Sequence, residues 1–352
     1  MMVMKTSAYI TNADIGVGTG GGIVSLNERL ALSNVTTLEA SISKVDIDPS
    51  LYHLANVPFL YDYLAWYKLL GAKVDIAHLY GGPFTQTVQH LKHCGAKVIL
   101  TIAAHNIELS IEEHKKLGYE YPYVHITNPF LWEVYSRYIR EADVVICPSK
   151  SSAEYLKQKL QPKGEVIVIP HGCYLPAKVE PIPEKFDAAY LGQFGPDKGL
   201  AYLIQAWSKL NFPEETLILA GDAGNRIANL LWNVGGKWHF PGYVPSASEV
   251  YNKCSVYVQP SVTEAFGIPV LEAMAHGRPV IVAEGAGVHE IVEDGKEGFI
   301  VPIRDAESIA ACIKHFHDSP EEVESMGANA RRKAEQYTWE KIRKMYEEVY
   351  LR

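Results

Sequence analysis

The sequence of 352 residues has no long hydrophobic run. Its longest apolar stretches, such as residues 98–104, fall far short of the roughly 18 residues that a helix needs to cross a membrane. The N-terminus also shows no secretory signal, because residues 1–5 lead into an apolar stretch at 8–10 that is too short. We therefore expect a cytoplasmic protein that is at most peripheral to a membrane.

The sequence also has few cysteines, and it has fewer positive than negative charges. The chain has five cysteines and no Cys-x-x-Cys pair, which favours free thiols in a reducing compartment over a disulfide framework or a zinc ribbon. The formal net charge is −8, of which −1 falls in residues 1–180 and −7 in residues 181–352. An acidic chain with no basic run is not expected to bind nucleic acid or to dock strongly on an anionic membrane.

Short apolar segments alternate with amphipathic segments along the chain. The apolar segments 74–79, 96–102 and 144–146 have the length of strands, and helical patterns such as 131–140 lie between them. Strands that are separated by helices form parallel sheets, and strands covered on both faces read as continuous apolar runs. The pattern predicts an α/β protein with parallel sheets.

A proline-rich stretch interrupts this alternation at residues 174–186 and indicates a linker. The pattern then restarts with a strand expected at 188–192. We therefore predict two doubly wound, Rossmann-like domains that face each other across a cleft, which is the expected ligand site. The predicted domains are 1–177 and 178–335, and residues 336–352 are expected to form a helix that crosses back to the first domain.

The strongest chemical signal lies in residues 260–280, directly after the apolar strand 256–258. Gly267 allows the backbone to approach a ligand closely, and Pro269 suits the first turn of a helix. The amides of Gly267 and Ile268 would then lie at the positive end of that helix, where a phosphate binds readily.

Two glutamates in this segment, Glu264 and Glu272, lie eight residues apart. Along a helix this separation is about 12 Å, longer than the roughly 5–9.5 Å between the carboxylates of a glycoside hydrolase. We interpret them as separate clamps for vicinal hydroxyls, one on a hexose and one on a ribose. The alternative for such a pair in isolation is two acids that merely decorate a helix start.

Residues 260–280 resemble the donor-site signature of the family 4 retaining glycosyltransferases, which have the GT-B fold. The resemblance covers nearly the whole chain and is strongest over residues 188–303. Residues 169–172 are similar to that family's domain-closing Ile-Pro-Asn-Gly, and residues 191–199 are similar to its phosphate loop. Residues 220–224 are similar to the strand-loop that follows, and residues 240–244 are similar to its nucleobase loop.

The resemblance implies roles for individual residues. Lys198 would stabilise the negative charge that develops on the leaving phosphate. Gln193 stands where the family usually has arginine, and an amide donates hydrogen bonds without carrying charge. Either Lys198 and the helix end suffice for the diphosphate, or another cation makes up the deficit. The expected donor-binding residues are Gly21, Gly22, Gln193, Lys198, Tyr243, Val244, Glu264, Phe266, Gly267, Ile268 and Glu272.

The N-terminal half resembles the family more loosely. Gly21 and Gly22 belong to a glycine-rich turn after the first strand, where the backbone can approach a phosphate or a sugar. This spacing is not the dinucleotide fingerprint, and such a turn also occurs without a ligand. His105 follows the strand 96–102, where the family commonly has a histidine that faces the donor sugar. The expected catalytic residues are thus His105, Lys198 and Glu264, although a histidine in that place can also be structural.

These features together predict a retaining hexosyltransferase of class EC 2.4 that uses a UDP- or GDP-sugar. The N-terminal domain would take a hydroxyl acceptor, either a glycan, a lipid-linked group or a small molecule. Aromatic residues in 59–70 and 119–123 suit such acceptors, although helix packing and loop anchoring are the commoner explanation. The alternatives are a non-catalytic nucleotide-sugar-binding module and a GT-B epimerase or phosphorylase.

No cofactor is expected beyond the nucleotide sugar, and a divalent metal is not expected. The histidines of the first domain show no ligand spacing such as His-Glu-x-x-His. Asp46 and Asp48 have an Asp-x-Asp spacing, but they lie in the wrong domain and are interpreted as a turn.

Overall fold

The computed structural model describes residues 4–11, 13, 20–43, 58–122, 127–222 and 236–352. The chain forms two compact units. The first unit contains Met1–Ala104, Pro122–His171 and Trp339–Arg352, and the second contains His105–Tyr121 and Gly172–Thr338. Residues 105–121 therefore belong to the second unit, although the chain reaches them from a strand of the first. Asp46 and Asp48 lie outside the described residues.

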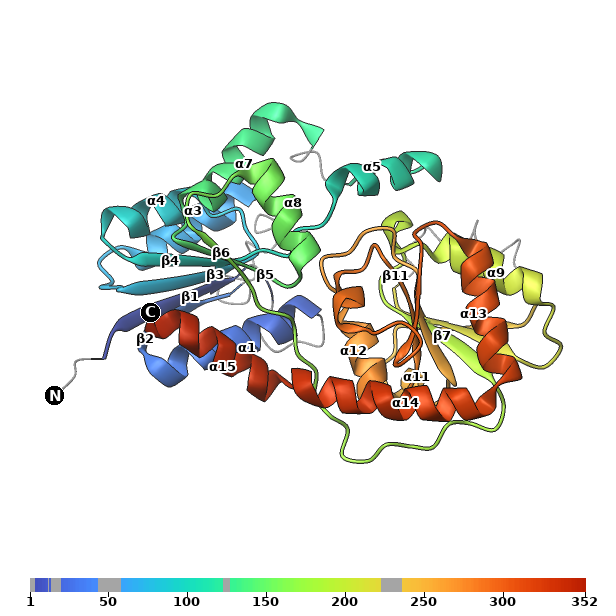
Figure 1. Ribbon diagram of the computed structural model, residues 1–352. Coiled ribbons are helices and arrows are strands. Elements are labelled where there is room, and N and C mark those ends of the chain that lie inside the picture. The colour runs from blue at the N-terminus through green and yellow to red at the C-terminus, as the bar shows by residue number, and fades with distance from the viewer. Residues whose placement is uncertain (1–3, 12, 14–19, 44–57, 123–126, 223–235) are drawn as a thin grey trace. The chain divides into compact units, whose positions relative to one another are not determined.

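The first unit contains a six-stranded parallel sheet in the order β2-β1-β3-β4-β5-β6. Helices α1 and α15 pack together on one face, and α3, α4, α7 and α8 form a row over the other (Figure 1). The strands are β1 Thr6–Thr11, β2 Thr37–Ile42, β3 Ile76–Tyr80, β4 Lys97–Thr101, β5 Val144–Cys147 and β6 Glu165–Val168. The helices are α1 Gly20–Val35, α3 Pro58–Leu69, α4 Thr85–His93, α7 Pro129–Glu141, α8 Lys150–Leu160 and α15 Trp339–Leu351.

The second unit contains another six-stranded parallel sheet, in the order β12-β11-β10-β7-β8-β9. Its strands are β7 Asp187–Leu191, β8 Thr216–Ala220, β9 Trp238–Gly242, β10 Val256–Gln259, β11 Val280–Ala283 and β12 Gly298–Val301. Its helices are α5 Ile107–Lys116, α9 Leu200–Leu210, α11 Ser248–Tyr251, α12 Ile268–Ala275, α13 Ala306–Asp318 and α14 Pro320–Ala334. The prediction of two doubly wound α/β domains is confirmed.

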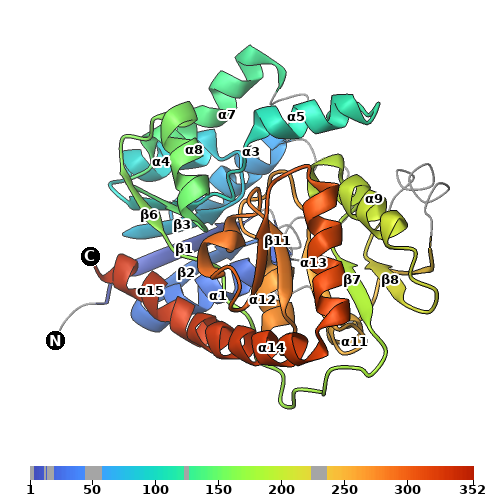
Figure 2. The same ribbon diagram turned by 45° about the vertical axis from the view of Figure 1, so that its right-hand side comes forward.

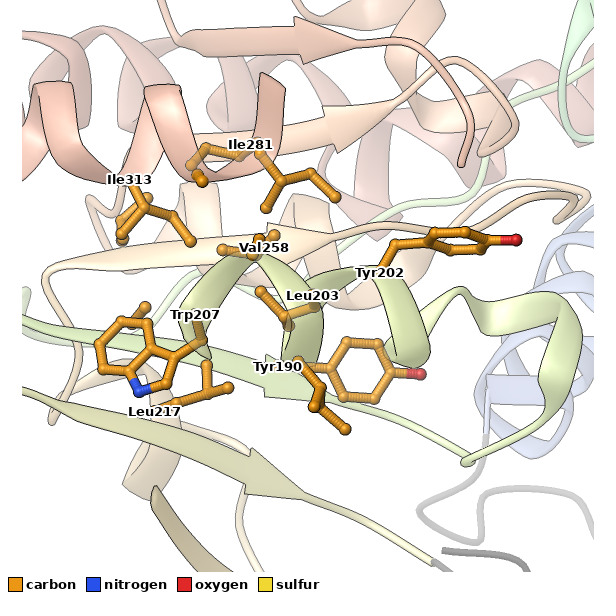
Figure 3. Close-up of a cluster of buried hydrophobic side chains, with 14 of the residues drawn as sticks. Tyr190, Tyr202, Leu203, Trp207, Leu217, Val258, Ile281 and Ile313 are labelled. Atoms are coloured by element: carbon orange, nitrogen blue, oxygen red, sulfur yellow. The ribbon is translucent and has the colours of Figure 1, made fainter. Parts of the chain in front are cut away.

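The core of the second unit follows from the alternation of side chains along its strands. On β10, Val256 and Val258 pack toward α9 and α13, whereas Tyr257 between them packs toward α12. Figure 3 shows Trp207 of α9 and Ile313 of α13 among the side chains that meet over this face of the sheet. Both faces are buried, which explains the continuous apolar runs in the sequence.

One face of the first sheet is not purely apolar. Tyr9 and His78 lie on neighbouring strands, are fully buried and face α1 and α15. His78 Nδ1 lies 2.5 Å from the hydroxyl of Tyr350 on α15, and its Nε2 lies 2.9 Å from Thr101 Oγ1. The hydroxyl of Tyr9 donates to Glu28 Oε2 at 2.7 Å. These hydrogen bonds attach α15 and α1 to the sheet through partners that water does not reach.

Burial shifts the carboxyl of Glu28 and the imidazole of His78 toward their neutral forms. It raises the pKa of Glu28 from 4.5 to about 7 and lowers the pKa of His78 from 6.5 to about 3. For Glu28, the folded state binds the proton more tightly than the unfolded state, so stability is lost as pH rises from 4.5 through about 7. For His78, stability is lost as pH falls from 6.5 toward 3, and the two effects oppose each other between 4.5 and 6.5.

Replacing Glu28 with glutamine is expected to remove the loss of folding stability that Glu28 causes as pH rises, because the amide stays neutral at every pH. Relative to wild type, Glu28→Gln should become more stable as pH rises from 5 to 8, by up to about 3 kcal/mol. Urea unfolding at a series of pH values measures the difference. If the difference in unfolding free energy between Glu28→Gln and wild type stays constant from pH 5 to 8, this assignment is contradicted.

Candidate functional site

The candidate site lies at the point in the second sheet where the strand order reverses. β7 is followed in the chain by β8 on one side, whereas β10, which pairs directly with β7, leads to β11 on the other. The loops after β7 and β10 therefore leave the sheet at adjacent carboxyl ends and in opposite directions. In open α/β sheets this is the usual position of a ligand site. Gln193 and Lys198 follow β7, and Glu264 and Gly267 follow β10.

Two glycines allow the loops at this edge to pack backbone against backbone. Gly199 has φ +70°, and a Cβ there would lie 1.9 Å from the carbonyl oxygen of Pro260. Gly221, after β8, has φ +131°, and a Cβ there would lie 1.8 Å from the carbonyl oxygen of Gly192. No side chain fits at either position. A hydrogen bond of 2.8 Å from the amide of Val262 to the carbonyl of Asp197 joins the same loops.

Lys198 and Glu264, predicted separately as a phosphate cation and a sugar clamp, form an ion pair. Lys198 Nζ lies 3.1 Å from Glu264 Oε1, and the two side chains are 20% and 18% exposed. Lys198 ends the short 3-10 helix η3, Pro196–Lys198. An ammonium has three donors, and the contact with Glu264 Oε1 needs one of them.

The other carboxylate oxygen of Glu264 is held by neighbours that the sequence analysis did not identify. Gln259 Nε2 donates to Glu264 Oε2 at 2.9 Å, and Ser261 Oγ donates to the same atom at 2.8 Å. Gln259 is in turn held by the hydroxyl of Tyr257 at 2.7 Å. Gln259 is a polar residue at the carboxyl end of a buried strand. This position is the signal in the sequence that could have identified it as a site residue.

Helix α12 begins at the predicted position. Gly267 is its N-cap with φ +112°, and the amide of Val270 donates to the Gly267 carbonyl at 3.1 Å. Within the described part of the chain, the amides of Gly267 and Ile268 have no backbone acceptor. Phe266 is buried, and its carbonyl accepts from the amide of Val288 at 2.8 Å, which fixes the approach to the helix. The arrangement has the free donors and the positive dipole end that an anion requires.

Glu272 lies in the second turn of α12, with a different partner from Glu264. The hydroxyl of Tyr251, which is fully buried at the end of α11, donates to Glu272 Oε2 at 2.9 Å. Burial raises the pKa of Glu272, and the Tyr251 hydrogen bond opposes this shift. Glu264 and Glu272 therefore have separate hydrogen-bond partners. Tyr251 lies outside the predicted motifs, and no sequence pattern pointed to it.

His105 belongs to the same unit as these residues. Its neighbour Asn106 donates its backbone amide to Thr263 Oγ1 at 2.9 Å, and Thr263 precedes Glu264. His105 and Glu264, the two predicted sugar-orienting residues, are thus the sequence neighbours of the hydrogen-bonded residues Asn106 and Thr263. Asn106 also caps α5, since its Oδ1 accepts from the amide of Leu109 at 3.0 Å.

The remaining predicted donor-site residues are less closely held. Gln193 is exposed, although its carbonyl accepts from the hydroxyl of Tyr190 at 2.8 Å. Tyr243, after β9, is 73% exposed, and Val244 is half-buried. The Gly242 carbonyl accepts from the amide of Gly221 at 2.9 Å, which brings the end of β9 to the end of β8. An exposed tyrosine ring next to this edge is available for stacking.

Gly21 and Gly22 lie in the first unit, in the first turn of α1. They follow β1, which pairs with β2 on one side and β3 on the other, so this is the strand-order reversal of the first sheet. A Cβ on Gly21 would lie 3.5 Å from Tyr80 Cε1 at the end of β3. Nothing further follows for a ligand at this position.

No group of three or more His, Cys, Asp or Glu side chains among the described residues is arranged to hold a metal ion. The described helices also include none with the length and apolar character of a membrane span.

Comparison with known proteins places these observations in a family. Glycosyl transferases group 1 matches residues 176–333, and Glycosyltransferase Family 4 matches residues 29–175. A D-inositol 3-phosphate glycosyltransferase from Streptomyces griseus is 35% identical over 114 residues, which are 32% of this chain and 24% of that protein. The chain spans between 22% and 60% of the length of the curated relatives that it matches.

Solved structures share the fold over the whole chain. Sucrose-phosphate synthase from Thermosynechococcus elongatus has a TM-score of 0.78 at 20% identity, over 99% of this chain and 98% of that chain. HepE from Anabaena, solved in complex with UDP-glucose, has a TM-score of 0.70 at 18% identity, over 98% of this chain and 99% of that chain. The family matches adjoin one another over residues 29–333, and the chain therefore belongs to the family 4 glycosyltransferases of the GT-B fold.

Proposed function

We propose that the protein transfers a hexosyl unit from a UDP- or GDP-sugar to a hydroxyl acceptor, with retention of anomeric configuration. The observation that carries this proposal is the juxtaposition of Lys198 with Glu264 beside the loop that leads into α12. A diphosphate and a sugar are neighbours in a nucleotide sugar, and here a cation for one lies 3.1 Å from a carboxylate for the other.

The diphosphate would bind between Lys198 and the amides of Gly267 and Ile268. Cleavage of the glycosidic bond places negative charge on the leaving phosphate, and donors that are already in place stabilise that charge without reorganisation. Glu272 would accept hydrogen bonds from the ribose hydroxyls. The ring of Tyr243, with Val244, would face the base. UDP and UDP-glucose in the HepE structures support a donor of this class.

Glu264 and His105 would orient the hexose. Glu264 Oε2 is engaged by Gln259 and Ser261, and its Oε1 by Lys198. Both oxygens therefore already have donors, which suits a fixed acceptor for sugar hydroxyls and does not suit a free nucleophile. We infer that Glu264 positions the sugar and takes no covalent part in the reaction.

Nucleotide binding provides the first test. UDP or GDP at about 100 times its dissociation constant should stabilise the protein by about 2.7 kcal/mol, and ADP should stabilise it less. In Glu272→Gln this ligand-induced stabilisation should fall by about 1.5–2.5 kcal/mol at the same nucleotide concentration, because a charged acceptor for the ribose is lost. Thermal unfolding with and without each nucleotide gives the difference. Glu324→Gln, an exposed carboxylate on α14, is the matched control. Equal ligand responses in Glu272→Gln and wild type would refute the ribose assignment.

Turnover tests the role of Lys198. Lys198→Gln should lower kcat by about 100-fold to 1,000-fold, since one electrostatic donor to the developing charge is removed. The rate of nucleoside diphosphate release from radiolabelled donors, measured with acceptor present, gives kcat. Lys253→Gln removes an exposed lysine from the same unit and should leave kcat unchanged. A Lys198→Gln enzyme as fast as wild type would overturn the assignment.

Gln193 offers a test in the opposite direction. Gln193→Arg places the charge that the family usually has in the phosphate loop, so nucleoside diphosphate should bind about 2-fold to 10-fold more tightly. Because this side chain is exposed, the gain should shrink as salt rises from 50 to 200 mM. Titration calorimetry at both concentrations measures it. If affinity does not change at low salt, residue 193 lies outside the phosphate site.

Gln193 also keeps the non-catalytic binding module open as a second candidate. Tight nucleotide-sugar binding without turnover for every acceptor class would identify that module. Turnover that needs no acceptor hydroxyl would instead indicate an epimerase or a phosphorylase.

A further inference from the structure

Helix α5 is part of the second unit, although its chain comes directly from β4 in the first. The chain enters the second unit at His105 and leaves it after Tyr121. Leu109 packs against the hydrophobic core of that unit, and α5 contacts η3 of the phosphate loop. Figure 2 shows α5 beside the start of α9. These 17 residues include His105, which is predicted to orient the sugar. Contacts within the second unit must therefore hold this segment in place.

The anchor at the middle of α5 is an ion pair whose carboxylate is buried and whose arginine side chain is 25% exposed. The carboxylate of Glu113 is fully buried, and its Oε1 lies 2.5 Å from Nε of Arg304. Its Oε2 accepts from the hydroxyl of Tyr202 on α9 at 3.0 Å. A carboxylate without water is tolerated only with such partners, and its hydrogen bonds hold it in one place.

Arg304 is itself held in a constrained conformation. It follows β12 and has φ +64°, a left-handed conformation that is uncommon for a residue with a side chain. The next residue, Asp305, caps α13 through hydrogen bonds of 3.0 Å from the amides of Glu307 and Ser308. The guanidinium also lies 3.2 Å from Glu112 Oε2. Strained backbone of this kind persists where the surroundings require it.

The two ends of α5 lie against the candidate donor site. At its start, the amide of Asn106 donates to Thr263 next to Glu264. At its end, Leu117 and Tyr119 line a small cavity together with Gly195 and Pro196 of the phosphate loop. The ion pair lies between these contacts, so its loss would free the helix and the residues at both ends.

We propose that Glu113 and Arg304 are positioning residues, whose ion pair holds α5 on the nucleotide-binding unit and so fixes His105 beside the donor sugar. The proposal rests on the function proposed above, in which His105 orients the hexose. It makes His105 a donor-side residue, although its place in the sequence is within the predicted acceptor-side domain. A small displacement of such a residue can cost about 100-fold in rate.

The test compares Glu113→Gln with wild type and with His105→Ala. Glu113→Gln keeps the side-chain shape and removes the charge, so kcat should fall about 10-fold to 100-fold. The dissociation constant for nucleoside diphosphate should change less than about 3-fold, because Lys198 and Glu272 are untouched. If Glu113 acts through His105, the double variant Glu113→Gln/His105→Ala should be no slower than His105→Ala alone.

Hydrogen exchange reports the docking itself. In wild type the amides of α5 should exchange as slowly as those of α9, and in Glu113→Gln they should exchange at least about 10-fold faster. The double variant Glu113→Leu/Arg304→Met replaces the pair with apolar side chains of similar size and should restore both the slow exchange and most of kcat. Glu307→Gln, which removes the partner of Lys209 on the surface of the same unit, should change neither quantity.

The outcomes separate this proposal from the function on which it rests. A wild-type enzyme without turnover refutes the function and the positioning role together. An active wild type whose Glu113→Gln variant keeps full kcat refutes the positioning role alone. So do rate losses that multiply fully in Glu113→Gln/His105→Ala, or unchanged exchange along α5.

Discussion

The reversal of strand order between β7 and β10 is the constraint on which the candidate site depends. These strands pair in parallel, and the chain leaves their carboxyl ends in opposite directions. Loops that diverge cannot cover the edge between them, so their backbone groups and side chains remain available to a ligand. Lys198 reaches this edge from one loop and Glu264 from the other. The ion pair between Lys198 and Glu264 therefore needs both loops.

Close backbone packing makes that geometry rigid. Gly199 contacts the carbonyl of Pro260, and Gly221 contacts the carbonyl of Gly192, both at distances that exclude a Cβ. Glu264 is then held by donors on Gln259 and Ser261. A site with fixed donors and acceptors stabilises charge without reorganisation, which is where most electrostatic catalysis originates.

Buried polar clusters attach distant parts of the chain in both units. In the first unit, His78 and Glu28 join β3 and α1 to the C-terminal helix. In the second, Glu113 and Arg304 join α5 to the end of β12. Burial shifts Glu28 and His78 in the first cluster toward their neutral forms, whereas the second cluster contains a guanidinium. Partners of this kind specify one arrangement, because any other leaves a polar group buried without a partner.

The sequence by itself determined the α/β class, most strands and helices, and the family, because these depend on periodicity and on short spacings such as Gly267 to Pro269. It also assigned Lys198 and Glu264 to loops of the second domain. Only the tertiary structure decided that these two form an ion pair, that Tyr251 holds Glu272, and that α5 belongs to the second unit. Glu113 and Arg304 lie 191 positions apart, and local pattern carries no information about contacts at that separation. The segment from Glu264 to Glu272 can therefore be identified from the sequence, whereas the residues that hold it in place cannot.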